Sequence, residues 1–491
     1  MAVNVYQHVC PSREDRLGSI TGYAGTLKEL TGRGLKGCLR NRDRCFNTSG
    51  QCAHFDALDQ LAAIVDSVVI DHAPQGCATG YIMWNTFGRR LAPMIGKKPR
   101  NVNVISTRMN ETDIIFGASE KLKAAIKFAN DRYHPKVIFV TGSCTSGIIA
   151  EDIPSVVTEV QQEIGVPIAY CSCEGIRSKM WSSGFDAAQH AMVKTMVKPP
   201  RRKSKNVNFV VFWPTVDAFL KPALARLDLE PLYISGLTGP ENHEFASESV
   251  ATVGQCGVLS SYYGGALQEH FGVPFLQEHF PYGISGFESW YMNLAALVGR
   301  EAEARKYIEE QWRQYGPEIE KLKSKLKGVK ALVALGSGMA FEIVHILRDL
   351  GMEVVHAVAF HYDPTLDNND GKINHIAKYA EDADDLDVSV ADSQQHELYK
   401  LLLKHKPDII FSRAHGSNIW GVYLGISTVE YGSASHALYG YAGLAELGNR
   451  IVDELSNRNF VKLIAKHFVS PFSKQFDNME NFAYLEKETA E

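Results

Sequence analysis

The stretch QCAHFDALDQLAAIVDSVVIDHAPQGC, residues 51–77, decides how the rest of the chain is interpreted. It carries a thiol near each end, Cys52 and Cys77. Apolar residues recur at helical spacing over 58–65, and a β-branched run at 68–70 predicts a buried strand. The turn that ends in Cys77 follows this strand, at the carboxyl edge where open α/β sheets bind ligands.

A third thiol occupies the same kind of position. Residues 137–140 read as a second buried strand, and the turn Thr-Gly-Ser-Cys that follows it ends in Cys144. A single buried cysteine is most often only a small hydrophobic residue. Two thiols at strand ends and one in front of a helix nevertheless predict a shared metal cluster.

Composition limits the function classes. The chain has 491 residues, 45% hydrophobic and 22% charged residues, and a net charge of −5, which argues against a nucleic-acid partner. No apolar run has membrane-spanning length and no signal peptide is recognisable, so a cytoplasmic protein is expected. The nine cysteines then indicate free thiols or metal ligands. Cys38 and Cys45 match no closed zinc pattern and are expected to be loop thiols.

Alternating strand and helix patterns predict an α/β fold of three doubly wound, Rossmann-like domains with parallel sheets around a central cofactor cleft. The predicted domains are 1–203, 204–327 and 328–491. Residues 1–50 are expected to be irregular, and the charged helix 301–326 to be interrupted at Gly316 and Pro317. The predicted strands are 68–70, 102–106, 137–140, 168–171, 207–213, 232–235, 273–276, 330–336, 354–358, 388–390 and 409–412.

Cys256 stands near the start of a helix predicted over 255–271. Thiolates near helix N-termini have lowered pKa values and coordinate soft metals well. Without the other cysteines, Cys256 would be interpreted as an ordinary buried thiol.

Ordered motifs give these residues a family context. They are H-A-P-Q-G-C at 72–77, D-I-I-F-G at 113–117, G-S-C-T-S-G-I-I-A-E-D-I at 142–153, C-E-G-I-R at 173–177, H-F-G-V-P-F at 270–275 and D-L-G-M-E-V-V at 349–355. From about residue 10 to about residue 470, the chain resembles the nitrogenase superfamily, specifically the catalytic α-type subunit of nitrogenase-like reductases.

The resemblance implies two metal centres and two partners. Cys52, Cys77 and Cys144 match the thiols that bind half of a P-type 8Fe-7S cluster shared with a β-type (K) subunit in an α2β2 heterotetramer. Cys256 matches a ligand of the large active-site iron–sulfur cluster. The helix after D-I-I-F-G resembles the docking surface for an ATP-dependent Fe-protein (H-type) homodimer. Phe116 would lie on that surface, although it can also be read as a core residue.

Departures from the family bear on the substrate. Trp181 and Phe185 replace a glutamine and a histidine that face the cofactor in molybdenum nitrogenase, and Gly336-Ser-Gly-Met-Ala replaces a segment carrying an arginine. The second cluster ligand is either His436 or Glu430, and a soft cluster favours the imidazole of His436. Dinitrogen reduction is therefore not expected.

A cavity with Trp181, Phe185, Met339 and Tyr439 suits a less polar substrate. With the C-P-S-R-E segment at 10–14, this pattern resembles the D subunit of methylthio-alkane reductase. The resemblance implies reductive cleavage of C–S bonds in small thioethers to methanethiol, in sulfur metabolism that supplies methionine biosynthesis. The environment of His415 lacks the lysines that hold homocitrate, so an all-iron cluster, similar to the NifB cofactor, is expected.

Three alternatives remain open on the residues alone. The chain could be a nitrogenase α subunit proper, or an E-type scaffold for nitrogenase cofactor assembly, which would keep the same thiols without releasing a product. It could also be a zinc-stabilised or thiol-free α/β binding protein in which all four cysteines are core residues.

Overall fold

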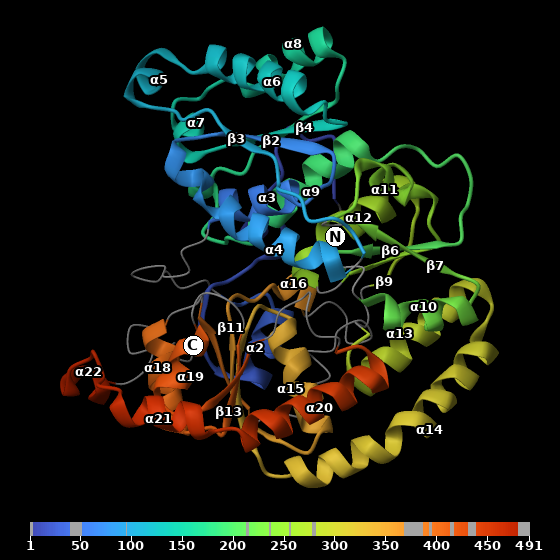
Figure 1. Cartoon of the computed structure of the whole chain (residues 1–491), viewed down its shortest axis with the longest axis vertical. Coiled ribbons are helices and arrows are strands. Elements are labelled where there is room, and N and C mark those ends of the chain that lie inside the picture. The colour runs from blue at the N-terminus through green and yellow to red at the C-terminus, as the bar shows by residue number, and fades with distance from the viewer. Residues whose placement is uncertain are drawn as a thin grey trace. The chain divides into compact units, whose positions relative to one another are not determined.

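The computed structural model describes residues 3–39, 52–94, 96–212, 216–234, 237–254, 257–276, 281–367, 386–391, 395–412, 417–430 and 438–479. Its α/β architecture contains three sheets (Figure 1). The predicted fold class is confirmed, and each predicted strand has an observed counterpart within a few residues at each end. The strands at 22–26, 251–254 and 427–430 were not predicted.

The first sheet has the order β3-β2-β4-β5 and is entirely parallel. Helices α6 and α8 pack on one face against apolar side chains of β2 and β4, and α3 and α9 lie on the other (Figure 1). β2 and β4 are buried along their whole length, as expected for central parallel strands. The elements are β2 (Ser67–His72), β3 (Val104–Ser106), β4 (Val137–Gly142), β5 (Ile168–Cys171), α3 (Ala53–Ala62), α6 (Ser119–Tyr133), α8 (Ile153–Ile164) and α9 (Ser183–Met196).

The second sheet repeats this topology with the order β7-β6-β8-β9, again all parallel. Its longest helix, α12, packs on β8 and also on α9. The elements are β6 (Asn206–Val210), β7 (Glu230–Ile234), β8 (Ala251–Gly254), β9 (Phe275–Leu276), α10 (Asp217–Arg226), α11 (Pro240–Glu244) and α12 (Gly257–Phe271).

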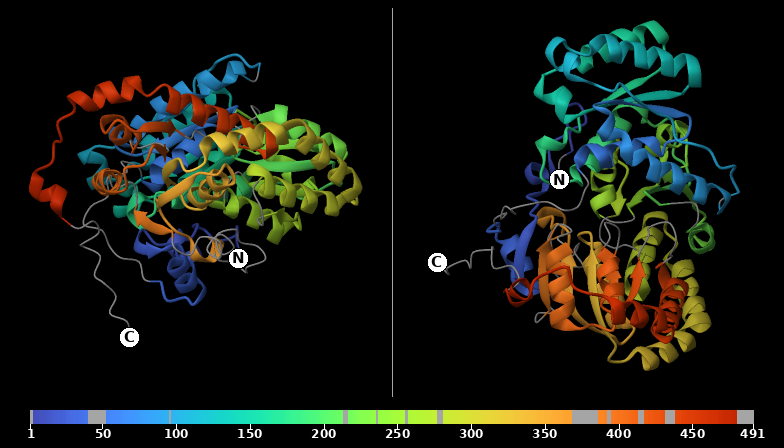
Figure 2. Two further views of the ribbon diagram at one scale, coloured as in Figure 1. Left: turned by 90° about the horizontal axis from the view of Figure 1, so that it is seen from below. Right: turned by 60° about the vertical axis from the view of Figure 1, so that its left-hand side comes forward.

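The third sheet has the order β1-β12-β11-β10-β13-β14, and only the edge strand β1 is antiparallel. In Figure 2 the C-terminal helices, drawn in red, run along the outside of this part of the chain. Its strands are β1 (Gly22–Thr26), β10 (Lys330–Leu335), β11 (Glu353–Ala359), β12 (Asp387–Ala391), β13 (Ile409–Ser412) and β14 (Ser427–Glu430). The main helices are α13 (Gly283–Val298), α14 (Glu301–Leu326), α15 (Met339–Asp349), α18 (Gln395–His405), α19 (Ser417–Tyr423), α20 (Gly440–Ser456), α21 (Asn459–His467) and α22 (Lys474–Asn478).

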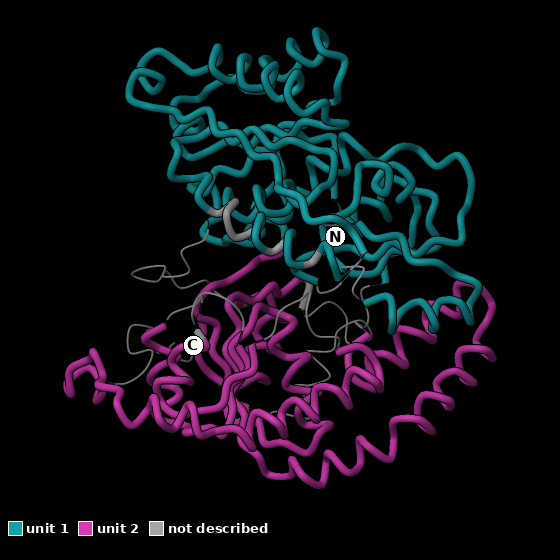
Figure 3. The backbone as a smooth tube through the Cα atoms, viewed as in Figure 1, with its two compact units in different colours: residues 1–16, 51–277 teal, residues 17–50, 278–491 magenta. Residues whose placement is uncertain are grey.

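Contacts between residues group the chain into two compact units (Figure 3). Unit 1 comprises Met1–Arg16 and Gln51–Gln277 and contains the first two sheets; unit 2 comprises Leu17–Gly50 and Glu278–Glu491 and contains the third. The three domains with boundaries at 203 and 327 therefore stay a prediction. Among the described residues, no helix is both long and apolar enough to cross a membrane.

Two sequence-based expectations were wrong. Residues 1–50 are not irregular throughout, because α1 (Arg13–Leu17), β1 and α2 (Leu27–Leu35) form there. Thr26 and Glu29 form a capping box at the start of α2. Strand β1 forms its backbone hydrogen bonds with β12, which lies far away in the sequence.

Helix α14 is also continuous through Gly316 and Pro317. Gly316 lies against the Trp312 ring, with its ideal Cβ position 3.0 Å from ring atoms, and α14 packs along α20. This packing compensates for the one backbone hydrogen bond that a proline removes.

All three sheets have a switch point, where the strand order reverses and ligands commonly bind. In the first sheet it lies between β2 and β4, the strands that precede Cys77 and Cys144. In the second it lies between β6 and β8, and Cys256 is the second residue after β8 in the sequence. The strand topology thus places Cys77 and Cys144 at a switch point.

A candidate cysteine-ligated metal centre

Local backbone structure presents each thiol of the first sheet. Cys77 lies in a 3-10 helical turn, Gln75–Gly80, and its amide donates to the Pro74 carbonyl at 3.0 Å. Cys144 is the first residue of the short helix α7 (Cys144–Ile148), which Ser143 caps by accepting from the Ser146 amide at 3.3 Å. Cys52 is the N-cap residue of α3, in extended backbone conformation.

A glycine brings two of these thiols together. A Cβ atom built on Gly175 would lie 3.2 Å from Cys52 Sγ and 3.5 Å from Cys144 Sγ. Gly175 belongs to the C-E-G-I-R motif, and its missing side chain leaves room for both sulfur atoms. Gly175 was not assigned to the site from the sequence alone. The glycine of the C-E-G-I-R motif was the feature of the sequence that could have indicated the closeness of the two thiols.

The thiols are close enough to affect one another electrostatically. The pKa of Cys77 is raised to about 11. Burial is the main cause, and the negative charges of Asp71, Cys52 and Cys144 add to the increase. Burial also raises the pKa of Cys52, and Cys144 adds to this shift. Three thiolates at this site therefore repel one another, and a positively charged metal centre would stabilise them.

This donor set fits a soft metal centre. Cys52 and Cys77 are exposed residues, and Cys144 is half-buried. Within the described ranges, no group of three or more His, Cys, Asp or Glu side chains is arranged to hold one metal ion. Soft thiolate donors favour iron–sulfur clusters or zinc.

A buried network of hydrogen bonds connects the segments that carry the thiols. His54, two residues after Cys52, lies with Nε2 2.8 Å from Asp71 Oδ1 and Nδ1 2.9 Å from the Gly142 carbonyl. Burial lowers the pKa of His54, but the charge of Cys173, followed by the hydrogen bond to Asp71, raises it well above its usual value. Cys173 Sγ donates to the same carbonyl at 3.4 Å. The network joins the segments that carry Cys52, Cys77 and Cys144.

Glu174 fixes the turn that contains Gly175. Its buried carboxylate accepts from the Tyr170 hydroxyl at 2.9 Å and the Ser172 hydroxyl at 2.8 Å. A Cβ on Gly142 would lie 2.8 Å from Glu174 Oε1, so the carboxylate packs directly on the backbone that leads to Cys144. Glu174 is thus a positioning residue that sequence reasoning missed.

The N-terminal C-P-S-R-E segment is anchored in unit 1 by buried charges. Arg13 Nη2 donates to Asp186 Oδ1 at 2.8 Å and to the Val258 carbonyl in the first turn of α12. Arg16 donates to Asp186 Oδ2 at 2.7 Å and to the Ser261 hydroxyl at 3.0 Å. This cluster joins the N-terminal segment to α9 and to the helix that follows Cys256.

The predicted substrate-facing residues lie in both units. Trp181 and Phe185 contact each other edge to face in unit 1, with ring centroids 5.7 Å apart. In unit 2, Met339 is buried at the start of α15, and Tyr439 stacks on Tyr282 at 5.3 Å. The two aromatic replacements therefore contact each other, and Phe185 is buried.

Several predicted residues lie outside the described ranges, namely Cys256, His436, His415 and Cys45. Their roles stay predictions. Glu430, the other candidate for the second cluster ligand, ends β14 with an exposed side chain, 3.5 Å from the Asn418 amide.

Phe116 is not a core residue. It is 82% exposed at the end of α5 (Glu111–Phe116), and Ile115 beside it is 72% exposed. Glu151 supports this region, because it lies 2.7 Å from His72 Nε2 and accepts from the Ala118 amide at 2.7 Å. The D-I-I-F-G motif therefore presents exposed apolar side chains, and Glu151 holds the residue that follows the motif in place.

Gly184 sets the distance between the helix of Cys52 and α9. A Cβ on Gly184 would lie 2.1 Å from the Ala53 carbonyl oxygen. We therefore expect Gly184→Ala to force α3 and α9 apart and to lower the free energy of unfolding by roughly 1–3 kcal/mol. Chemical denaturation would measure this loss.

The matched control is Gly32→Ala in α2, whose Cβ would meet nothing within 4 Å. It should leave stability unchanged or raise it by about 0.5–1 kcal/mol. Equal stability of the two variants would contradict the close packing of α3 on α9.

Comparison with known proteins supports the same family. The family model "Nitrogenase component 1 type Oxidoreductase" matches residues 52–456. The nitrogenase iron-molybdenum cofactor biosynthesis protein NifE of Methanosarcina barkeri is 27% identical over 410 residues, covering 78% of this chain and 84% of that protein. The nitrogenase molybdenum-iron protein alpha chain of Methanothermobacter marburgensis is 28% identical over 401 residues, covering 77% and 80%. The solved structure "Nitrogenase Cp1 at pH 5" superposes with a TM-score of 0.72 at 22% identity, covering 88% and 92%.

Proposed function

The chain belongs to the nitrogenase component 1 type oxidoreductase family, and on this premise we propose that it is the catalytic subunit of a reductase for methylthio-alkanes. The proposed reaction is R–S–CH3 + 2e− + 2H+ → R–H + CH3SH. One C–S bond breaks, the carbon gains a hydrogen, and methanethiol leaves. An ATP-dependent Fe-protein supplies the two electrons, and solvent supplies the protons.

The three gathered thiols carry the redox part of this proposal. Cys52, Cys77 and Cys144 would hold one half of a P-type 8Fe-7S cluster. Two of these thiols are exposed, so ligands from a β-type subunit could complete the coordination within an α2β2 heterotetramer. When bound, this cluster and the active-site cluster supply electron storage and transfer. Cys256 and His436 would hold the active-site cluster, which we propose to be all-iron.

The aromatic pair supports the proposed substrate class. Trp181 and Phe185 occupy positions where molybdenum nitrogenase has side chains that can relay protons or hydrogen-bond, and their rings pack on each other. Phe185 cannot transfer a proton. These rings would exclude water and favour an apolar thioether by burying its alkyl groups.

The exposed D-I-I-F-G surface supports the proposal that an Fe-protein binds to this chain. Phe116 and Ile115 are large, exposed apolar side chains next to the thiol-bearing sheet. Exposed aromatic residues are common anchors of protein interfaces. We propose that the Fe-protein docks here.

A scaffold for cofactor assembly is the second candidate. It is favoured by one observation: a NifE protein and a nitrogenase alpha chain are almost equally identical to this chain, at 27% and 28%. A scaffold would hold a cluster without releasing methanethiol.

Turnover by the anaerobically purified complex separates the two candidates. With the Fe-protein, ATP and a reductant, dimethyl sulfide should yield methanethiol and methane in equal amounts. Omitting ATP is the control and should stop both products. A complex that contains clusters but forms neither product would support the scaffold instead.

Metal analysis tests the cluster assignment. We expect the purified complex to contain iron and neither molybdenum nor vanadium in stoichiometric amounts. The protein should be brown, with broad visible absorption. Stoichiometric molybdenum would overturn the all-iron proposal, and a colourless protein that contains zinc would overturn the redox function.

A further inference from the structure

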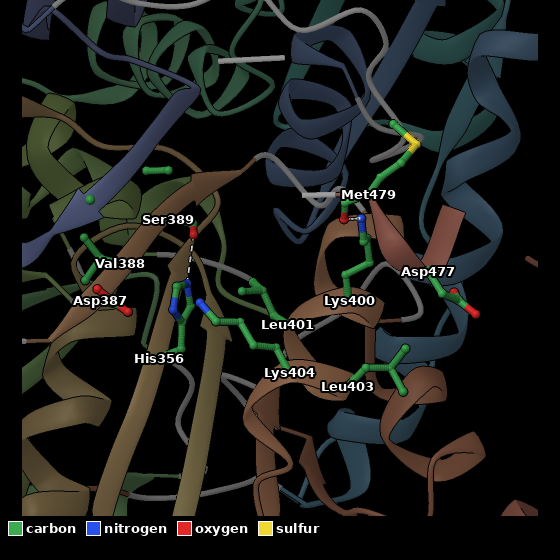
Figure 4. A pocket seen from close by; sticks show the side chains of 12 residues that line it. His356, Asp387, Val388, Ser389, Lys400, Leu401, Leu403, Lys404, Asp477 and Met479 are labelled. Atoms are coloured by element: carbon green, nitrogen blue, oxygen red, sulfur yellow. Dashed lines mark hydrogen bonds between the residues drawn. The ribbon is translucent and has the colours of Figure 1, made fainter. Parts of the chain in front are cut away.

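Unit 2 contains a cavity of about 550 Å³ that none of the functions above uses (Figure 4). It lies at the amino-terminal halves of β11 and β12, beneath the last turns of α18. The switch point of this sheet lies at the carboxyl ends of β10 and β13, so the cavity belongs to the opposite edge. Its polar lining is formed by His356, Asp387, Ser389, Lys400, Lys404 and Asp477.

His356 forms the floor of the cavity and has a nitrogen without a partner. Its side chain is 4% exposed, and Nε2 lies 2.8 Å from the Ser389 hydroxyl. Among the described residues, Nδ1 is buried with no hydrogen-bonding partner. Burial, followed by the nearby His405 and Lys404, lowers the pKa of His356 to about 3, so the ring is neutral at physiological pH. Buried polar atoms without partners are rare in proteins.

Opposite charges flank this imidazole. Asp387 and Ser389 lie two residues apart on β12 and share one face of the strand, and the register places Asp387 beside His356. The Lys404 side chain reaches toward the His356 ring from α18 (Figure 4). In the part of the chain that the structure describes, neither Lys404 nor Asp387 forms an ion pair. One positive and one negative group are thus available at the same end of the cavity.

The rest of the lining is largely apolar. Leu401 and Leu403 contribute aliphatic side chains, and Met479 lies at the far end near Lys400. The Lys400 ammonium donates to the Met479 carbonyl, so it is already engaged within the protein. A ligand for this cavity therefore needs adjacent positive and negative groups at one end and a short aliphatic chain at the other.

We propose that this cavity binds a free α-amino acid with an apolar side chain. The carboxylate of the ligand pairs with the Lys404 ammonium. The ammonium of the ligand pairs with the Asp387 carboxylate. The aliphatic side chain packs on Leu401. This proposal does not depend on the proposed redox function.

Calorimetric titration of the purified complex with L-leucine tests the proposal. 4-Methylpentanoate lacks only the amine of leucine, and 3-methylbutylamine lacks only its carboxylate. Each should bind at least about tenfold more weakly than leucine, because each loses one charge-assisted hydrogen-bonded pair. Equal affinity of the acid and leucine would overturn the amino-acid assignment, and so would absence of leucine binding at millimolar concentration.

Two variants locate the binding. Lys404→Gln and Asp387→Asn change exposed side chains, so the fold should be retained, and each should weaken leucine binding at least about tenfold. The matched control is Lys462→Gln, an exposed lysine of α21, which should leave the affinity unchanged. Unchanged affinity in both cavity variants would place leucine elsewhere and overturn the proposal.

Discussion

Replacing Cys144 with alanine is expected to remove the P-type cluster and to reduce thioether turnover at least about 10–100-fold, the range that weaker changes around metal ligands already produce. Cys144 is half-buried, and its sulfur would lie 3.5 Å from a Cβ atom built on Gly175. Alanine keeps the helix start that Ser143 caps, so the fold should persist while one cluster ligand is lost. Iron content and the absorption spectrum of the purified complex measure the cluster directly, independently of activity.

Two further variants make this result specific. Cys256→Ala should also abolish turnover but leave the spectrum of the P-type cluster, because it would remove only the active-site cluster. Cys38→Ala changes an exposed thiol with no assigned role and should behave as wild type. Full iron content and full activity in Cys144→Ala would refute the proposed ligand set.

Replacing Asp186 with alanine is expected to lower the free energy of unfolding by about 3–5 kcal/mol, the usual cost of breaking a buried ion pair from one side. Asp186 is fully buried and pairs with both Arg13 and Arg16, whose side chains are 0% and 4% exposed. Without the carboxylate, two guanidinium groups would remain in a poorly hydrated interior. The free energy of unfolding from chemical denaturation provides the measurement.

The control for this prediction is Glu163→Ala. Glu163 pairs with Lys127 at 2.5 Å, but both side chains are nearly half exposed. Exposed pairs typically contribute about 0–1 kcal/mol, so this variant should be almost as stable as wild type. If Asp186→Ala does not fold, Asp186→Asn keeps the shape and removes only the charge, and it should still be clearly less stable than the control. Equal stability of Asp186→Asn and Glu163→Ala would contradict a structural role for the buried cluster.

Much of the fold could be predicted because its signals are local. The buried strands at the centre of the first sheet are continuous apolar runs, and the turns after them end in Cys77 and Cys144. Strand–helix alternation gives parallel sheets, and parallel sheets place strand ends at one edge. The positions of these two thiols therefore follow from sequence pattern and topology together.

The features that sequence reasoning missed depend on long-range contacts. β1 is a strand because it pairs with β12, and α14 continues through Pro317 because it packs on α20. Gly175 lacks a side chain because two sulfur atoms from other segments occupy that space. The partners of Arg13 lie in α9 and α12, far along the chain. Local patterns contain no information about such distant neighbours.

The pairing of Gly22 with Ala391 has a consequence for biosynthesis. The edge strand β1 leaves the ribosome long before β12 exists, and Arg13 likewise waits for α9 and α12. The first sheet, with its three sulfur ligands, is translated in the meantime and can assemble on its own, because domains generally fold as units during synthesis. Strand β1 would then join its sheet late in folding. In a nascent chain that is stopped near residue 280, we expect the first sheet to have formed around its thiols while β1 still has no partner strand.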